Sequence, residues 1–205
     1  AIYIDSDTIV VDDIAKLYNT ELGNNLFGAC TDSSIQYVDK MVKYIKDVLD
    51  LDPKKYINSG MLVLNSKAFR DEGFIDHFMN LLDKYHFDCI APDQDYLNEI
   101  GDGRILHLDP RWDAMPNENT EPLPNPGLIH YNLFFKPWHF DNVQYQDYFW
   151  KYAKETPFYE ELHTELDNYT DEERSEDRAK LDHMLEKEDS TVVDPNNWAH
   201  VKAKG

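Results

Sequence analysis

The chain has 205 residues and a formal net charge of −20, from 20 basic and 40 acidic residues. Nucleic acids and anionic membranes both attract basic surfaces, so we expect no nucleic-acid partner and at most a weak peripheral contact with a membrane. A hydrophobic fraction of 41% is enough to form a core, which excludes wholesale disorder.

The cysteine content points to a reducing compartment. Cys30 and Cys89 lack the spacing of a metal site, and one disulfide between them is the alternative. No stretch has the length and apolarity of a membrane span, and no basic-then-apolar leader is visible. We therefore expect a cytoplasmic protein, although the chain begins abruptly inside a strand-like run.

Strands and helices alternate along the first 140 residues. The apolar spacing predicts, in chain order, strand-like runs at 2–4 and 9–11, a helix at 33–51 capped by Ser33 or Ser34, a strand within 56–65 after a polar interruption, a helix at 74–85, a short helix from Asp93 to Gly101, and strands at 104–108 and 128–131. Residues 109–127 contain five prolines and are expected to form an irregular loop. The alternation predicts an α/β sheet over residues 1–140.

Residues 141–205 are expected to form a C-terminal helical extension and tail. Thr156 followed by Pro157 predicts one helix start, and Thr170 with Glu173 has the spacing of a capping box. The many acids of the last helical segment favour a solvated helix face.

The opening stretch "AIYIDSDTIV" places Asp5 and Asp7 at the end of a strand. Side chains two residues apart on a strand share a face, so the two carboxylates converge if the extended geometry persists through Ser6. Close carboxylates raise one another's pKa unless a divalent cation lies between them. Mg²⁺ and Mn²⁺ prefer such oxygen ligands, and α/β sheets bind ligands at the carboxyl ends of their strands.

Two other interpretations of this pair stay open at this point. Surface acids in a turn are the common case for a bare Asp-x-Asp. The stretch "DSDTIV" also fits the first motif of haloacid-dehalogenase-like phosphatases, with Asp5 as nucleophile and Asp7 as general acid. That family needs a later acidic metal motif, and the nearest candidate, "GDGRIL", has Leu106 where the second acid is required.

Four stretches together resemble glycosyltransferase family 8, the group of glycogenin and the lipopolysaccharide galactosyl- and glucosyltransferases. They are "YIDSDTIV", "YINSGMLVLN", "PDQDYLN" and "LIHYNLFFKPWH", in that order within residues 1–140. The resemblance implies a GT-A-type, Rossmann-like mixed sheet flanked by helices. It also implies a retaining hexosyltransferase that uses Mn²⁺ or Mg²⁺ and a UDP-hexose donor, UDP-glucose or UDP-galactose, with a glycan or glycolipid acceptor.

The same resemblance implies roles for individual residues. Its metal ligands fall on Asp5, Asp7 and His130, and Asp5 is also expected near the ribose of the donor. Its diphosphate-binding lysine falls on Lys136. Its donor-sugar positions fall on Asn58, Asp93 and Gln94. Gln94, near the anomeric carbon, and Asp93 are the catalytic candidates. Gly60 is expected to let the backbone approach the ligand closely.

Each of these residues also has an ordinary structural interpretation. A lone histidine such as His130 is more often packed than a metal ligand. Asp93 has the position of a helix N-cap, Asn58 that of a turn residue, and Lys136 is a common surface residue.

The chain departs from the family pattern in two places. Leu133 stands where the family has a glycine that contacts phosphate. The chain begins at Asp-x-Asp, without the strand-loop-helix unit that precedes this motif in the family and binds uracil and ribose. We expect that unit to lie outside this sequence rather than to be missing from the protein, so the N-terminal part of the sheet is expected to be absent from this chain. This second departure suggests, as a further alternative, a catalytically inactive sugar-nucleotide-binding module.

Overall fold

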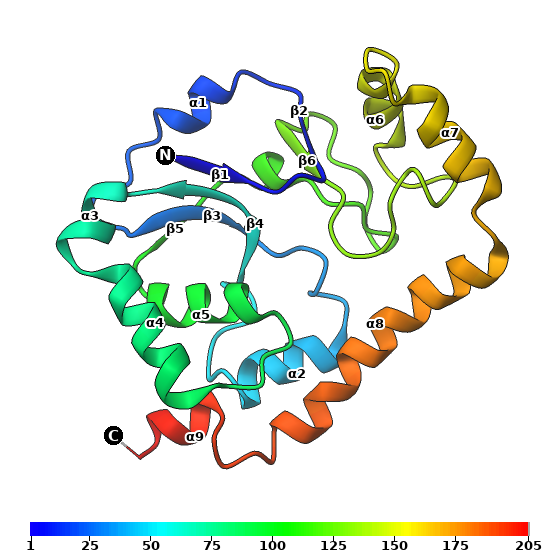
Figure 1. The fold of residues 1–205 in the computed structure, drawn as a ribbon. Coiled ribbons are helices and arrows are strands. Elements are labelled where there is room, and N and C mark those ends of the chain that lie inside the picture. The colour runs from blue at the N-terminus through cyan, green and yellow to red at the C-terminus, as the bar shows by residue number, and fades with distance from the viewer. Residues whose placement is uncertain (205) are drawn as a thin grey trace.

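The computed structural model describes residues 1–204, and its main sheet has the strand order β1-β4-β3-β5 (Figure 1). These strands are β1 (Ile2–Ile4), β4 (Ile57–Leu64), β3 (Phe27–Thr31) and β5 (Ile105–His107). β4 runs antiparallel to both of its neighbours, whereas β3 and β5 are parallel, so the sheet is mixed. A second, two-stranded antiparallel sheet pairs β2 (Thr8–Val10) with β6 (Leu128–His130).

Alternating side chains on the central strands bury both faces of the main sheet. Phe27 and Leu62 face α4 (Phe74–Tyr85) and α5 (Pro92–Gly101), which lie on one side (Figure 1). Cys30 and Met61 face the other side, toward the second sheet, α1 (Ile14–Tyr18) and the 3₁₀ helix η1 (Pro110–Asp113). On the α4 side the core continues to α2 (Asp39–Asp47), and α3 (Ser66–Asp71) follows β4 directly.

The C-terminal helices leave the core and return to it. The four helices are α6 (Gln146–Ala153), α7 (Tyr159–Asn168), α8 (Asp171–Thr191) and α9 (Trp198–Lys202). In Figure 1, α8 runs from the α7 corner back to α2, and α9 lies near α4. Trp198 is buried and stacks on Phe87 with 4.1 Å between the ring centroids. The last helix therefore completes the core that α2, α4 and α5 begin.

Several expectations from the sequence are confirmed. The helix at 74–85 has the bounds of α4, α5 ends at Gly101, and the strands at 104–108 and 128–131 contain β5 and β6. Thr170 and Glu173 form the predicted capping box, in which each side chain bonds the backbone of the other residue.

Other expectations were wrong in their boundaries. The helix predicted at 33–51 is only Asp39–Asp47, because Ser34 bonds the Asp32 carboxylate instead of capping a helix. The polar residues 58–60 do not interrupt β4 but lie within it. Asp93 is not a cap, since α5 begins after Ala91 without a side-chain cap, and α7 begins at Tyr159 rather than at Pro157. The elements α1, β3, α3 and α9 had not been predicted.

The acidic helix α8 is only partly the solvated face that its composition suggested. Asp177, Glu188 and Thr191 are buried, and Glu188 accepts a hydrogen bond from Lys43 on α2. Cys30 and Cys89 are both buried free thiols, so the alternative of a disulfide is wrong. Within residues 1–204, no helix combines the length and the apolarity that crossing a membrane requires.

Candidate active site

The Asp-x-Asp motif forms the turn that joins the two sheets. Asp5 follows the end of β1, Ser6 and Asp7 form a turn, and Thr8 begins β2. The extended geometry therefore does not persist through Ser6, which corrects the reason for which the two carboxylates were expected to converge. The backbone holds the turn from both sides, because the Asp5 N–H donates to the Gly60 carbonyl at 2.8 Å and the Tyr131 N–H donates to the Asp7 carbonyl at 2.9 Å.

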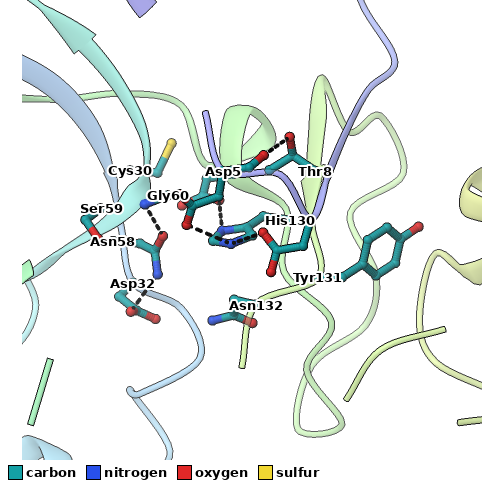
Figure 2. A network of polar contacts seen from close by, with 12 residues as sticks. Asp5, Thr8, Cys30, Asp32, Asn58, Ser59, Gly60, His130, Tyr131 and Asn132 are labelled. Carbon is teal, nitrogen blue, oxygen red and sulfur yellow. Dashed lines mark hydrogen bonds and ion pairs between the residues drawn. The ribbon is translucent and has the colours of Figure 1, made fainter. Parts of the chain in front are cut away.

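His130 lies opposite this turn, as the last residue of β6 and the pairing partner of Thr8. Its Nε2 lies 3.7 Å from Oδ2 of Asp5 and 3.4 Å from Oδ1 of Asp7. Figure 2 shows the imidazole beside the Asp5 carboxylate, with Asn58 reaching toward Asp32 from β4. Lys136 donates to Asp7 and to the Tyr131 carbonyl. We call Asp5, Asp7, His130 and Lys136 the cation corner.

Gly60 packs directly behind the cation corner. A Cβ atom at this position would lie 2.2 Å from Cε1 of His130 and 2.9 Å from Oδ2 of Asp5. Those distances are far below van der Waals contact, so no other residue fits without moving the imidazole. The expectation that Gly60 gives a ligand access to the backbone remains a prediction. The space left by its missing side chain is occupied by the ring of His130.

A second polar group lies beside the corner, around the buried carboxylate of Asp32. The side-chain amides of Asn58 and Gln94 donate to its Oδ2 at 3.0 and 3.1 Å. Asn58 also accepts from the Gly60 N–H, and Gln94 accepts from the Ser59 N–H. Asn58 and Gln94, two of the predicted donor-sugar residues, therefore both donate to the Asp32 carboxylate. Their bonds to the backbone of Ser59 and Gly60 connect them through β4 to the cation corner.

Asp93 differs from its neighbour Gln94. It lies in the first turn of α5 and is exposed, whereas Gln94 is buried. Among residues 1–204 no hydrogen bond to its carboxylate is formed.

The pKa values of two residues of the corner, His130 and Asp7, are shifted strongly by their neighbours. Burial disfavours charge on His130, but hydrogen bonds to Asp113 and Asp7 outweigh it and raise the pKa of this imidazole to about 9. Burial likewise raises the pKa of Asp7, but His130 and Lys136 outweigh it and hold that pKa well below its usual value. The Tyr3 hydroxyl donates to Asp5, which raises the pKa of Tyr3 to about 12. Asp7 thus stays charged at neutral pH, beside His130 and Lys136.

The donor set fits a divalent cation. Asp5, Asp7 and His130 each offer one ligand atom, and these atoms lie within 4.8 Å of one another. Two carboxylate oxygens with one imidazole nitrogen suit Mn²⁺ or Mg²⁺, and the nitrogen favours Mn²⁺. The space that Gly60 leaves for the imidazole is a second feature that matches a built site.

Two buried acids of the site had not been predicted. Asp32 accepts hydrogen bonds from the side chains of Asn58 and Gln94, and the Asp113 carboxylate lies 3.0 Å from Nδ1 of His130. Asp32 follows the unpredicted strand β3, and Asp113 lies in the proline-rich loop. A single acid in either place has no pattern of its own, and only the fold brings it to the site.

The chain matches the family description "Glycosyl transferase family 8" over residues 1–142. This match covers well over half of the sequence. The chain belongs to glycosyl transferase family 8. The matched residues contain the cation corner, Asn58, Gly60 and Gln94, so the resemblance to this family seen in the sequence is confirmed.

Curated relatives agree with this membership. A putative glycosyltransferase of Haemophilus influenzae is 29% identical over 118 residues, which are 58% of this chain and 35% of the relative. General stress protein A of Bacillus subtilis is 25% identical over 173 residues, which are 76% of this chain and 58% of the relative. The chain thus spans between a third and three fifths of the length of these two relatives.

Solved structures identify the fold. The bifunctional glycosyltransferase WbbM in its apo form matches with a TM-score of 0.66 and 24% identity, over 80% of this chain and 34% of WbbM. The galactosyltransferase LgtC, solved with donor and acceptor sugar analogues, matches with a TM-score of 0.58 and 23% identity, over 85% of this chain and 64% of LgtC. The mixed sheet flanked by helices is therefore a GT-A fold, as the resemblance implied.

Proposed function

We propose that this chain is the catalytic part of a metal-dependent, retaining glycosyltransferase that moves a hexose from UDP-glucose or UDP-galactose to a glycan or glycolipid acceptor. The observation that carries the proposal is the meeting of Asp5, Asp7 and His130 beside Lys136, since these residues come from distant parts of the sequence. Family membership supports the same class of reaction.

In this proposal the cation corner binds the diphosphate of the donor. Asp5, Asp7 and His130 would hold the cation, which, when bound, neutralises the negative charge that develops on the leaving diphosphate. Lys136 is held beside Asp7 and supplies a further positive charge at the same place. No protein base is required, because the leaving phosphate can accept the proton of the acceptor hydroxyl on the same face of the sugar.

The sugar would lie over the polar group next to the corner. Asp32 fixes the amides of Asn58 and Gln94, so these groups are in place before a ligand binds. Gln94 would face the anomeric carbon and stabilise positive charge there, and the exposed Asp93 would accept hydrogen bonds from sugar hydroxyls. We further propose residues 1–140 as the catalytic unit, residues 141–205 as its extension, and the cytoplasm as its location.

Two alternatives give different outcomes in simple assays. A phosphatase that uses Asp5 as nucleophile would release phosphate from generic phosphate esters in the presence of Mg²⁺, and the family match argues against it. An inactive sugar-nucleotide-binding module would bind a UDP-hexose in calorimetry and form no product with any acceptor.

The test is Mn²⁺-dependent release of UDP from UDP-glucose and UDP-galactose, by hydrolysis or by transfer. We expect Asp7→Ala to abolish this release, because the carboxylate contacts both His130 and Lys136. Asp12→Ala, which removes an acid that pairs with Lys16 and Arg111 outside the corner, is the control and should retain it. Unchanged turnover of Asp7→Ala would refute the metal assignment.

A further inference from the structure

A buried carboxylate lies behind the histidine of the cation corner. Asp113 is the last residue of η1, its side chain has no exposed surface, and its Oδ1 lies 3.0 Å from Nδ1 of His130. The two residues are 17 positions apart in a sequence whose motifs gave no reason to pair them.

Backbone hydrogen bonds fix the distance between these two side chains. The His130 N–H donates to the carbonyl of Ala114 at 3.0 Å, and the Ala114 N–H donates to the carbonyl of Leu128 at 2.9 Å. Ala114 follows Asp113, so the end of η1 is attached directly to β6. The carboxylate and the imidazole are thus carried by two adjacent backbone segments.

The two ring nitrogens of His130 face different groups. Nδ1 faces Asp113, while Nε2 faces Asp5 and Asp7. A neutral imidazole carries its proton on one nitrogen and offers a lone pair on the other. A carboxylate at Nδ1 keeps the proton there and leaves the lone pair on Nε2, on the side of the two aspartates.

Gly60 leaves the space in which the ring lies. A Cβ atom at Gly60 would collide with Cε1 of His130, and His130 is only 3% exposed. The ring position in which Nδ1 meets Asp113 is therefore one that the surrounding packing accommodates.

The unbonded oxygen of Asp113 distinguishes it from a carboxylate kept for stability. Its Oδ2 is buried and has no hydrogen-bond partner among residues 1–204. Asp95, another fully buried acid, accepts hydrogen bonds from Tyr44, Tyr56 and the backbone of Ala91. Burying a half-bonded carboxylate is unfavourable for folding, and the one bond that Asp113 makes goes to a proposed metal ligand, His130.

The geometry points to Asp113 as a positioning residue that holds His130 as the Nδ1–H tautomer with Nε2 directed at the cation. This inference rests on the proposed function, because it assigns the orientation of one proposed metal ligand. Carboxylates behind metal-binding histidines typically contribute about 10–100-fold to metal affinity.

The test is calorimetric titration of Mn²⁺ into the full chain in the presence of UDP. Asp113→Asn should bind Mn²⁺ about 10–100-fold more weakly than the wild type. Asp95→Asn is the matched control, since it changes an equally buried acid outside the corner, and it should leave the Mn²⁺ affinity unchanged. Wild-type affinity in a folded Asp113→Asn protein would overturn the positioning role.

Two further measurements separate the possible failures. His130→Ala should lose Mn²⁺ binding, and if it binds like the wild type, the proposed function fails. The role of Asp113 is decided independently by long-range ¹H–¹⁵N correlation spectra of the metal-free wild type at alkaline pH, where the ring is neutral. A proton on Nδ1 is expected. A proton on Nε2 would refute the role of Asp113, even if the Asp113→Asn variant does not fold.

Discussion

Two acids near strand β4, the fully buried Asp95 and the half-buried Asp7, are held by different kinds of partner. Asp95 lies near the start of the strand and accepts only from neutral donors, among them the hydroxyls of Tyr44 and Tyr56. Burial raises the pKa of Asp95 to about 6, although these hydrogen bonds oppose the shift. At the cation corner, by contrast, His130 and Lys136 hold the pKa of Asp7 far below its usual value.

The difference separates a structural acid from the acids that we propose bind a cation. The Asp95 cluster joins α2, the residue before β4 and α5 through hydrogen bonds from neutral groups, and proton uptake by Asp95 makes the folded protein more stable. The cation corner instead brings carboxylates into contact with an imidazole and an ammonium group, whose positive charges lower the pKa of Asp7. Groups whose pKa values are strongly shifted by close charges are common at functional sites.

The largest effect that this comparison predicts is for Gly60→Ala. The added methyl group would collide with His130 and Asp5, so we expect Mn²⁺ affinity to fall more than about 100-fold and stability to fall by about 1–3 kcal/mol. Calorimetry and denaturant unfolding measure the two effects. Ser59→Ala, at the preceding position of β4, is the control. Wild-type Mn²⁺ affinity in Gly60→Ala would show that the corner is not as tightly packed as described.

A smaller effect is predicted for the free energy of unfolding, which should depend on pH through Asp95. The folded protein holds the Asp95 proton more tightly than the unfolded chain does, because the pKa rises from 3.8 to about 6. The free energy of unfolding should therefore fall as pH rises from about 4 to about 6, by up to roughly 3 kcal/mol from this group.

Urea unfolding of the wild type and Asp95→Asn across this range isolates that contribution. The stability advantage of the wild type over the variant should shrink as pH rises. An advantage that grows with pH would mean that Asp95 is stabilised as the anion, like Asp7, and the contrast between the two clusters would fail.

The smallest effect is predicted for Leu133, which follows the corner in the loop toward Lys136. Leu133 has a φ of 56°, in the left-handed region that a residue with a Cβ rarely adopts, and its side chain is 38% exposed. Leu133→Gly should relieve about 1–2 kcal/mol of strain, partly offset by about 0.5–1 kcal/mol of chain entropy, so stability should rise slightly.

The control for Leu133→Gly is Leu133→Ala, which keeps the Cβ and should show no gain in urea unfolding. A loss of stability in the glycine variant would mean that the leucine side chain makes a contact that compensates the strain. The glycine-like backbone at this position also explains how the chain keeps the loop while lacking the glycine that the family has there.

The sequence was informative wherever a pattern repeats or a motif is complete. The spacing of Phe74, Phe78 and Leu82 predicted α4 with its bounds, and the four motifs predicted the family and the residues of the cation corner. Residues 58–60 misled, because a small polar run suggests a turn. They lie within a strand, because the Asn58 side chain bonds Asp32 and the backbone of Ser59 bonds Gln94.

The features that the sequence did not predict depend on contacts between residues that are distant in the sequence. Asp113 meets His130 because η1 is bonded to β6, and Asp32 meets Gln94 across 62 residues. Neither acid stands in a motif. The buried Glu188 of α8 was likewise hidden among exposed acids, and only the packing of α8 against α2 distinguishes it.

The most direct test of the central claim is the anomalous scattering of Mn²⁺ in crystals of the full chain soaked with MnCl₂ and UDP. The account predicts one anomalous peak within coordinating distance of Asp5, Asp7 and Nε2 of His130, with the diphosphate of UDP on its open side. A peak that His130 does not coordinate, or UDP bound without any ion at this corner, would contradict it.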